Sequence, residues 1–283
     1  MLLAPIASVV GMLFASIFYH INILTASIIV IGLLSGQIAV NVLDDYIDYK
    51  RGIDTSTTQT KFSGGSKYMV KKQITPKGTL ALGMLLLSIA LIIGIYIIIN
   101  HPIVLPFVLV GLLSILFYAK YLINIPFFAE PLVAINYALV TIGSFAAMAN
   151  SLVYGIGAAL CGISIGVIVT TLLVVNEVPD RQADRKHGRK SGVVILWHNK
   201  KIARFYMFWI ALPYIAILIG VLAGFLPAVI LSAFILIPFA MIVQDAIKVY
   251  KSPKSFEKYM GFNVIHGFAF IIVVLLAVIT AVI

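Results

Sequence analysis

Residues 79–99 read TLALGMLLLSIALIIGIYIII, a run without a single charged side chain. About 20 apolar residues are enough for an α-helix to cross the hydrocarbon core of a bilayer. The whole chain has the same character, with 62% hydrophobic and 11% charged residues and a mean hydropathy of +1.11 over 283 residues. A soluble domain carries about a quarter charged residues, so the composition excludes the soluble class and predicts an all-α, polytopic membrane protein.

The same length criterion, applied outward from this run, predicts nine transmembrane helices. Apolar runs fill the chain and no long polar linker separates them, so we expect a single domain over residues 1–283. Short turns, such as the one at His101 and Pro102, separate paired helices. The predicted spans are 3–20, 24–47, 76–99, 102–120, 127–149, 153–178, 202–222, 226–247 and 260–282.

The charged residues fall only in alternate connections between these spans. All 20 Lys/Arg and all 10 Asp/Glu lie after spans two, four, six and eight, in the stretches 44–77, 120–130, 177–204 and 245–258. Cytoplasmic connections of membrane proteins are rich in Lys and Arg. The pattern therefore predicts cytoplasmic loops at about 48–76 and 178–203. We expect a multi-pass protein of the cell membrane with a cytoplasmic N-terminus, an external C-terminus and its active site at the cytoplasmic face.

The net charge of +10 is compatible with several anionic partners. No motif that combines aromatic and basic residues accompanies it, and the charges lie beside membrane spans, which argues against nucleic acid. Membrane lipid and an anionic substrate are the expected partners.

The first acidic motif lies at the cytoplasmic end of the second predicted span. Residues 41–54 read NVLDDYIDYKRGID. At about 100° per residue, Asn41, Asp45 and Asp48 lie on one face of a helix. An amide and two carboxylates therefore converge near the membrane boundary, with Asp44 and Asp54 close by in sequence.

The second acidic motif lies at the equivalent end of the sixth predicted span. Residues 176–191 read NEVPDRQADRKHGRKS. Asn176, Asp180 and Asp184 follow one another at four-residue spacing, which places them along one face of a helix. Both motifs therefore begin with Asn, continue with spaced carboxylates and end in basic residues.

Two such motifs on the same side of the membrane predict a magnesium–diphosphate site. Mg²⁺ prefers carboxylate oxygens and keeps phosphate oxygens and waters as its other ligands. Clustered carboxylates repel one another, and a bound cation turns that repulsion into attraction. Neighbouring Lys and Arg would neutralise the remaining phosphate charge. A single acidic cluster is more often a solvated helix face, whereas two matching clusters favour a binding site.

The two motifs together resemble those of the UbiA superfamily of intramembrane prenyltransferases. The stretch from Asp45 to Asp54 is most similar to the branch that prenylates dihydroxynaphthoate in menaquinone synthesis. The resemblance implies Mg²⁺-dependent transfer of an isoprenyl group from an allylic diphosphate to a lipophilic or aromatic acceptor. It implies metal ligands and catalytic carboxylates at Asn41, Asp45, Asp48, Asp180 and Asp184. It implies diphosphate contacts at Asn41, Lys61, Lys120, Asn176, Arg189 and Lys190, with further roles for Asp44, Asp54 and Tyr118.

Two alternatives remain open at this stage. A secondary transporter for an anionic solute would place polar groups near the bilayer midplane, whereas the carboxylates here lie at one edge. A scaffold with acidic surface loops would bind ligand without needing Mg²⁺. The small residues Gly143, Ser144, Gly162 and Gly166 lie in the middle spans, and we expect them to leave room for an isoprenyl chain if they do not serve close helix packing.

Overall fold

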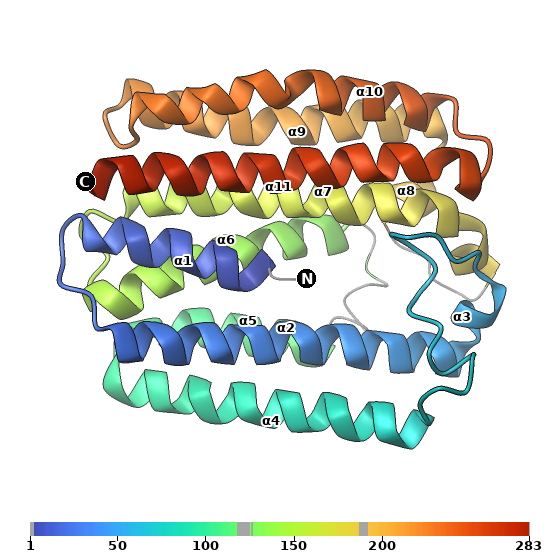
Figure 1. The fold of residues 1–283 in the computed structure, drawn as a ribbon, viewed down its shortest axis with the longest axis horizontal. Coiled ribbons are helices and arrows are strands. Elements are labelled where there is room, and N and C mark those ends of the chain that lie inside the picture. The colour runs from blue at the N-terminus through green and yellow to red at the C-terminus, as the bar shows by residue number, and fades with distance from the viewer. Residues whose placement is uncertain (1–2, 118–124, 126, 187–191, 283) are drawn as a thin grey trace.

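The computed structural model describes residues 3–117, 125, 127–186 and 192–282, and these residues form helices without any strand. The long helices run side by side, and their connections lie at the two ends of the bundle (Figure 1). The elements are α1 (Leu3–Ser16), α2 (Ile23–Arg51), α3 (Ile53–Ser56), α4 (Pro76–Asn100), η1 (Pro102–Val104), α5 (Leu105–Phe117), α6 (Ala129–Ala149), α7 (Ile156–Lys186), α8 (Val193–Leu196), α9 (Asn199–Leu222), η3 (Ala228–Leu236), α10 (Ile237–Lys248) and α11 (Pro253–Val282).

The described residues contain seven helical segments long and apolar enough to cross a membrane: α2, α4, α6, α7, α9, η3 with α10, and α11. This confirms an all-α polytopic membrane fold. The predicted spans 3–20 and 102–120 correspond instead to shorter apolar helices. With 14 residues, α1 is about 21 Å long, which is less than the hydrocarbon thickness of about 30 Å.

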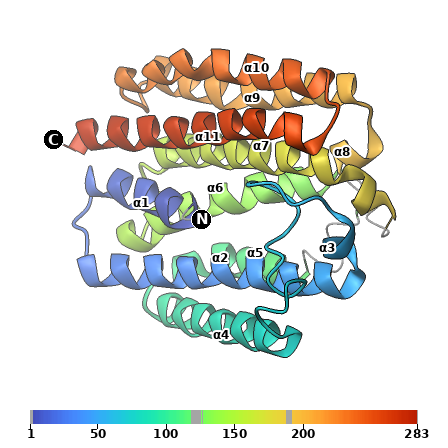
Figure 2. The same cartoon turned by 45° about the vertical axis from the view of Figure 1, so that its right-hand side comes forward.

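The helices stack in layers from α9 and α10, through α11 and α7, then α1 and α6, to α2 and finally α4 (Figures 1 and 2). Small residues bring α6 and α7 close together. A Cβ on Gly162 would lie 2.9 Å from the Ala138 carbonyl oxygen, and Gly166 faces the Ala134 backbone. These glycines therefore serve close helix packing, and the expectation that they leave room for an isoprenyl chain was wrong.

The other two small residues are engaged in the same way. Ser144 donates a hydrogen bond to Ser8 across α6 and α1 (2.9 Å between the hydroxyl oxygens), and a Cβ on Gly143 would lie 3.1 Å from the Cβ of Phe107. Any chain-binding groove lies elsewhere.

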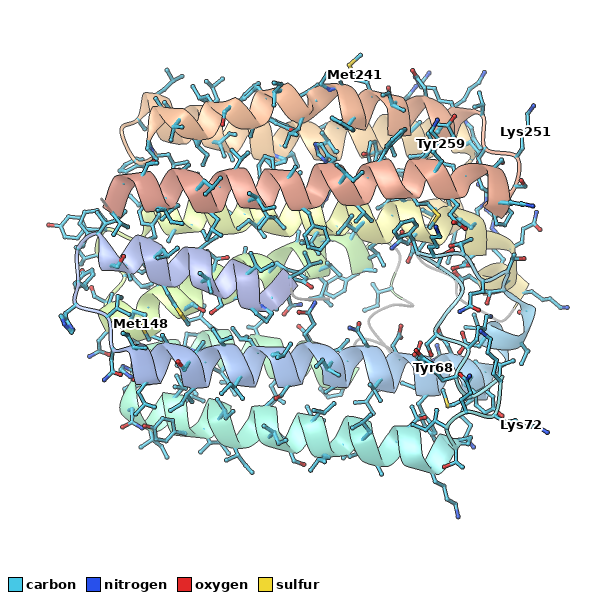
Figure 3. All side chains as sticks on the ribbon, viewed as in Figure 1. Tyr68, Lys72, Met148, Met241, Lys251 and Tyr259 are labelled. Carbon is cyan, nitrogen blue, oxygen red and sulfur yellow. The ribbon has the colours of Figure 1, made fainter. Side chains whose placement is uncertain are left out.

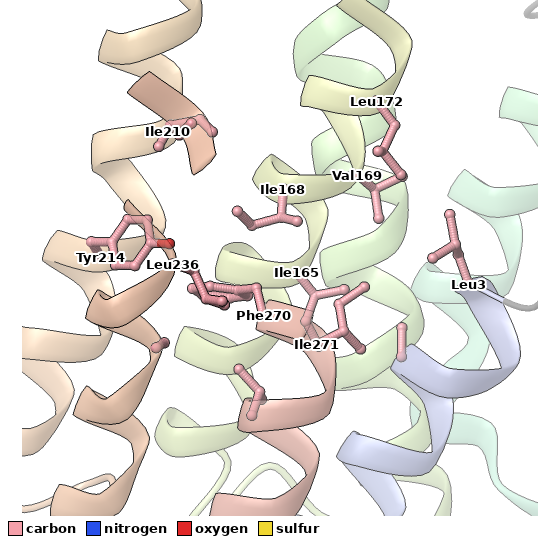
Figure 4. Close-up of a cluster of buried hydrophobic side chains, with 14 of the residues drawn as sticks. Leu3, Ile165, Ile168, Val169, Leu172, Ile210, Tyr214, Leu236, Phe270 and Ile271 are labelled. Carbon is pink, nitrogen blue, oxygen red and sulfur yellow. The ribbon is translucent and has the colours of Figure 1, made fainter. Parts of the chain in front are cut away.

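Buried aliphatic and aromatic side chains join α7, α9, η3 and α11 in one core (Figure 4). Ile165 and Ile168 of α7 are fully buried there, together with Phe270 of α11. The α2–α4 pair on the other side of the bundle is much less buried, and Ile92 and Ile99 of α4 are 67% and 72% exposed. Apolar surface of this extent is suited to contact with lipid.

Polar residues gather at one end of the bundle, where α2 and α7 end and α9 and α11 begin. Lys72 and Lys251 extend from this end, whereas Met148 marks the opposite one (Figure 3). We refer to it as the polar end.

At the polar end, α7 extends beyond the predicted end of its span at residue 178. It continues to Lys186 although Pro179 lies inside it, where proline lacks the N–H that would bond four residues back. The predicted loop at 178–203 is therefore shorter and contains α8. As a consequence, Asn176, Asp180 and Asp184 all lie on one continuous helix.

Candidate active site

The first acidic motif is carried by the last three turns of α2. The helix is continuous from Ile23 to Arg51, so Asn41, Asp45 and Asp48 lie on one face as predicted. Asn41 is exposed, and both carboxylates are half-buried. The helix ends at Gly52, whose left-handed backbone (φ 78°) directs its N–H back to the carbonyl oxygens of Asp48 and Tyr49.

After Gly52 the chain folds into α3 and a loop held by a buried lysine. Asp54 lies on α3 with 5% of its surface exposed, and its carboxylate contacts Gly65. The Lys67 ammonium, also buried, donates hydrogen bonds to the Asp54 backbone oxygen and to the Thr57 hydroxyl. Lys67 was not among the predicted site residues, because nothing in the sequence distinguishes it from the other lysines of this loop.

This loop connects the two acidic motifs. The Gly64 N–H donates a hydrogen bond of 2.9 Å to Asp180 Oδ2 on α7, across 116 positions of sequence. Gly64 has φ +87°, and a Cβ there would lie 2.6 Å from the Thr58 carbonyl oxygen, so this turn requires glycine. Lys61, a predicted diphosphate contact, is exposed on the same loop. The motifs thus meet through the loop after α3, while α2 itself packs mainly on α4.

The side chains of the second acidic motif range from partly exposed to buried. Asn176 and Asp180 are partly exposed, and Asp184 is 2% exposed. Tyr250, in the connection between α10 and α11, lies beside this motif. Burial raises the pKa of Tyr250, the Arg181 charge opposes the shift, and the Asp180 carboxylate adds to it. The phenol therefore stays neutral at physiological pH and keeps a proton to donate.

Two further carboxylates lie where α6 and α7 approach α8. Glu130 and Glu177 are 1% and 8% exposed, and a Cβ on Gly192 would lie 3.5 Å from an oxygen of each. Glu130 Oε1 accepts a hydrogen bond of 2.6 Å from the Val193 N–H. Glu130 therefore anchors the start of α8. Glu177 was missed by sequence reasoning, because it stands beside Asn176 and outside the four-residue spacing.

Four predicted site residues lie outside the part of the chain that the structure describes: Tyr118, Lys120, Arg189 and Lys190. Their predicted roles stay predictions.

The donor set at the polar end fits magnesium when a diphosphate shares the site. Over the described ranges, no group of three or more His, Cys, Asp or Glu side chains is assembled to hold a metal ion. Mg²⁺ is usually bound by one or two carboxylates together with substrate phosphate oxygens, so it does not need such a group. The half-buried Asp45 and Asp48 on α2 and Asp180 on α7 are hard oxygen donors of the required kind.

The fold and the site together define a polytopic helical membrane protein whose two acidic motifs are linked by a loop at its polar end. Residues 3–266 match the UbiA prenyltransferase family. The chain belongs to this family.

Known proteins similar to the chain agree with this assignment. A 1,4-dihydroxy-2-naphthoate octaprenyltransferase of Bacillus subtilis (strain 168) is 26% identical over 193 residues, which cover 67% of this chain and 60% of that relative. The apo structure of a UbiA homolog from Aeropyrum pernix K1 superposes with a TM-score of 0.70 at 16% identity, covering 96% of each chain. A structure of digeranylgeranylglyceryl phosphate synthase has a TM-score of 0.65 at 17% identity, covering 99% of this chain and 94% of the other. At these identities the two structures show the shared fold alone.

Proposed function

We propose that this prenyltransferase transfers an isoprenyl group from an allylic diphosphate to an aromatic, lipophilic acceptor in quinone or lipid biosynthesis, with Mg²⁺ as cofactor. The observation that carries the proposal is the hydrogen bond from Gly64 to Asp180. It holds the loop that follows α3 against the second motif, which supports a single diphosphate site served by carboxylates of both motifs.

The chain's own residues have distinct parts in this reaction. Asn41, Asp45 and Asp48 from α2, with Asp180 and Asp184 from α7, would hold the metal, and Asn176 would orient the diphosphate. Bound Mg²⁺ supplies positive charge that stabilises the diphosphate leaving group as the allylic C–O bond breaks. The exposed Lys61 ammonium donates to phosphate oxygens from the loop that Gly64 anchors.

The apolar helices of the bundle have a second role in the reaction. Water captures an allylic cation unless the site excludes water. The chain below the motifs is a bundle of apolar helices, which keeps water from the isoprenyl end of the donor. The acceptor carbon then attacks the cation, and the acceptor loses a proton.

We place the site at the cytoplasmic face and infer nine membrane segments, with the short helices α1 and α5 completing the bundle. Support comes from the confinement of all Lys and Arg to alternate connections. The N-terminus is then cytoplasmic and the C-terminus external.

The proposed acceptor class is supported by the similarity to the dihydroxynaphthoate octaprenyltransferase and by the resemblance of residues 45–54 to the menaquinone branch.

The proposal is tested by assaying the purified protein with allylic diphosphates of increasing length. The aromatic acceptors in the assay include 1,4-dihydroxy-2-naphthoate. We expect a prenylated product by mass spectrometry and release of diphosphate, both lost when EDTA removes magnesium. Flux of an anionic solute into vesicles, without prenylated product, would support the transporter alternative instead.

A further inference from the structure

The polar end has a second charged face, on the other side of α7 from Asn176. Arg181 and Arg185 follow Asp180 and Asp184 by one residue each, so they lie about 100° around the helix from these carboxylates. Two arginines of the second motif therefore lie on a neighbouring face of the helix.

These arginines border an open hollow of about 870 Å³ between the end of α7 and the start of α9. None of the described residues that line it is acidic. Its lining consists of Arg181, Arg185, Leu196, Trp197, His198, Asn199 and Lys200.

The start of α9 adds positive potential to the hollow. No side chain of the described residues caps this helix at His198, and its first turn contains no acid. Lys200 and Lys201 lie there instead, although the positive end of a helix dipole favours anions. An anion bound in the hollow would therefore interact favourably with both lysines and the helix end.

The two arginines are held in place by neutral acceptors. Arg181 donates to the Asn199 side-chain oxygen (2.9 Å) and Arg185 Nε donates to the Ile195 carbonyl oxygen (2.8 Å). These bonds orient the guanidinium groups without neutralising them. Like charges four residues apart on a helix repel each other, so an anion between the two arginines would stabilise this arrangement.

A row of aromatic rings leads from the hollow along α9. Ring centroids are 5.7 Å apart for Trp197 and Phe205 and 5.1 Å apart for Phe205 and Trp209. The Lys201 ammonium lies 4.0 Å from the Trp197 ring centre at the charged end of the row. Between the ring centres of Trp197 and Trp209 the row therefore spans at most about 11 Å. The three aromatic side chains are half-buried, so one side of the row remains exposed on the surface of the bundle.

We propose that the hollow and this aromatic row bind one anionic phospholipid of the surrounding leaflet. The phosphate headgroup contacts Arg181, Arg185 and Lys200, and an acyl chain lies against Phe205 and Trp209. Basic pockets at the ends of membrane helices are suited to such headgroups, and the apolar row provides the contact that a soluble anion would not use. The site is separate from the carboxylates and does not depend on the proposed reaction.

Both tryptophans of the chain belong to this row, so intrinsic fluorescence reports on the site directly. The 283-residue chain is reconstituted in phosphatidylcholine vesicles. One sample contains phosphatidylglycerol with brominated acyl chains, and the other contains brominated phosphatidylcholine at the same mole fraction. We expect brominated phosphatidylglycerol to quench more strongly, and high salt to reduce the difference. Equal quenching by the two lipids would overturn the proposal.

Lys200→Glu is the main variant, because Lys200 is exposed and its replacement should not disturb folding. Each basic charge near the membrane surface should change the preference for phosphatidylglycerol about fivefold. Replacing Lys by Glu changes the charge by two, so this preference should fall about 25-fold. Arg185→Gln should lower it about fivefold. Lys77→Glu, on α4 at the opposite side of the bundle (Figure 1), should leave it unchanged.

A retained preference in Lys200→Glu would contradict the site. Free diphosphate in the aqueous phase should not displace the brominated phosphatidylglycerol. Complete displacement would show that the hollow takes a soluble phosphate and would refute the lipid assignment.

Discussion

Asp180 has two separable functions in this structure, and two substitutions distinguish them. Its Oδ2 accepts the Gly64 N–H at 2.9 Å, and its charge belongs to the proposed metal site. Asp180→Asn keeps an oxygen for Gly64 but removes the charge, whereas Asp180→Ala removes both. A hydrogen bond to a charged group contributes about 1.5–3 kcal/mol and a neutral one about 1 kcal/mol. Because Asp180 is half-buried, we use the lower value of about 1.5 kcal/mol for the native bond.

Loop anchoring should therefore respond differently to the two variants. Loss of about 1.5 kcal/mol in Asp180→Ala should increase amide hydrogen exchange of residues 58–66 about tenfold, and Asp180→Asn should increase it only about twofold. Turnover of an allylic diphosphate should fall at least about 100-fold in both variants, because both lose the charge. Asp245→Asn is the control: this exposed carboxylate pairs only with Lys248 among the described residues (2.8 Å) and should change neither quantity.

Two results would refute this reasoning. Turnover near the wild-type level in Asp180→Asn would show that the reaction does not use the charge. Equal hydrogen exchange in the two variants would show that the bond from Gly64 does not anchor the loop.

Further expected outcomes follow from the same structure. Gly52→Ala places a side chain at φ 78° and should destabilise the protein by about 1–2 kcal/mol in thermal unfolding; an unchanged transition would contradict the role of Gly52 in ending α2. Lys67→Met removes the donor to Asp54 and Thr57 and should make the α3–α4 connection sensitive to limited proteolysis, with wild-type resistance as the contrary result. Gly166→Leu should lower yield and turnover alike for donors of every length, because it overpacks α6 against α7; a selective loss with long donors would restore a groove there. A cysteine at Thr57 should be labelled only from the cytoplasm and one at Asn150 only from outside, and labelling of both from one side would exclude the proposed topology.

The membrane fold was predictable because hydropathy and charge report directly on the bilayer. Lipid contact demands runs of about 20 apolar residues, and the alternating charges gave the connections. Hydropathy does not show where a helix ends inside a bundle. For this reason the predicted span 3–20 was longer than α1, which ends at Ser16.

A candidate site could be predicted because two matching acidic clusters at equivalent helix ends favour a binding site over a solvated helix face. Helix periodicity placed Asn41, Asp45 and Asp48 on one face, and α2 confirms that placement. The predicted span ended at residue 178, but α7 continues through Pro179 to Lys186, and Asp180 and Asp184 lie on the helix that their spacing predicted.

The contacts between the motifs were beyond the reach of sequence reasoning. The bonds from Gly64 to Asp180 and from Lys67 to Asp54 and Thr57 depend on the path of an irregular loop. No periodic pattern encodes that path, and loops carry no repeating signal of the kind that helices do.

In the proposed function, the two acidic motifs, carried by α2 and α7, form a single diphosphate site. Its most direct test is magnesium-dependent binding of an allylic diphosphate analogue in which sulfur replaces the bridging oxygen. We predict that Asp48→Asn and Asp180→Asn each weaken binding in the presence of magnesium by about 10- to 100-fold. The double variant should bind only slightly more weakly than either single one, because both residues serve one site. Wild-type binding in either single variant, or losses that multiply fully in the double variant, would contradict the account.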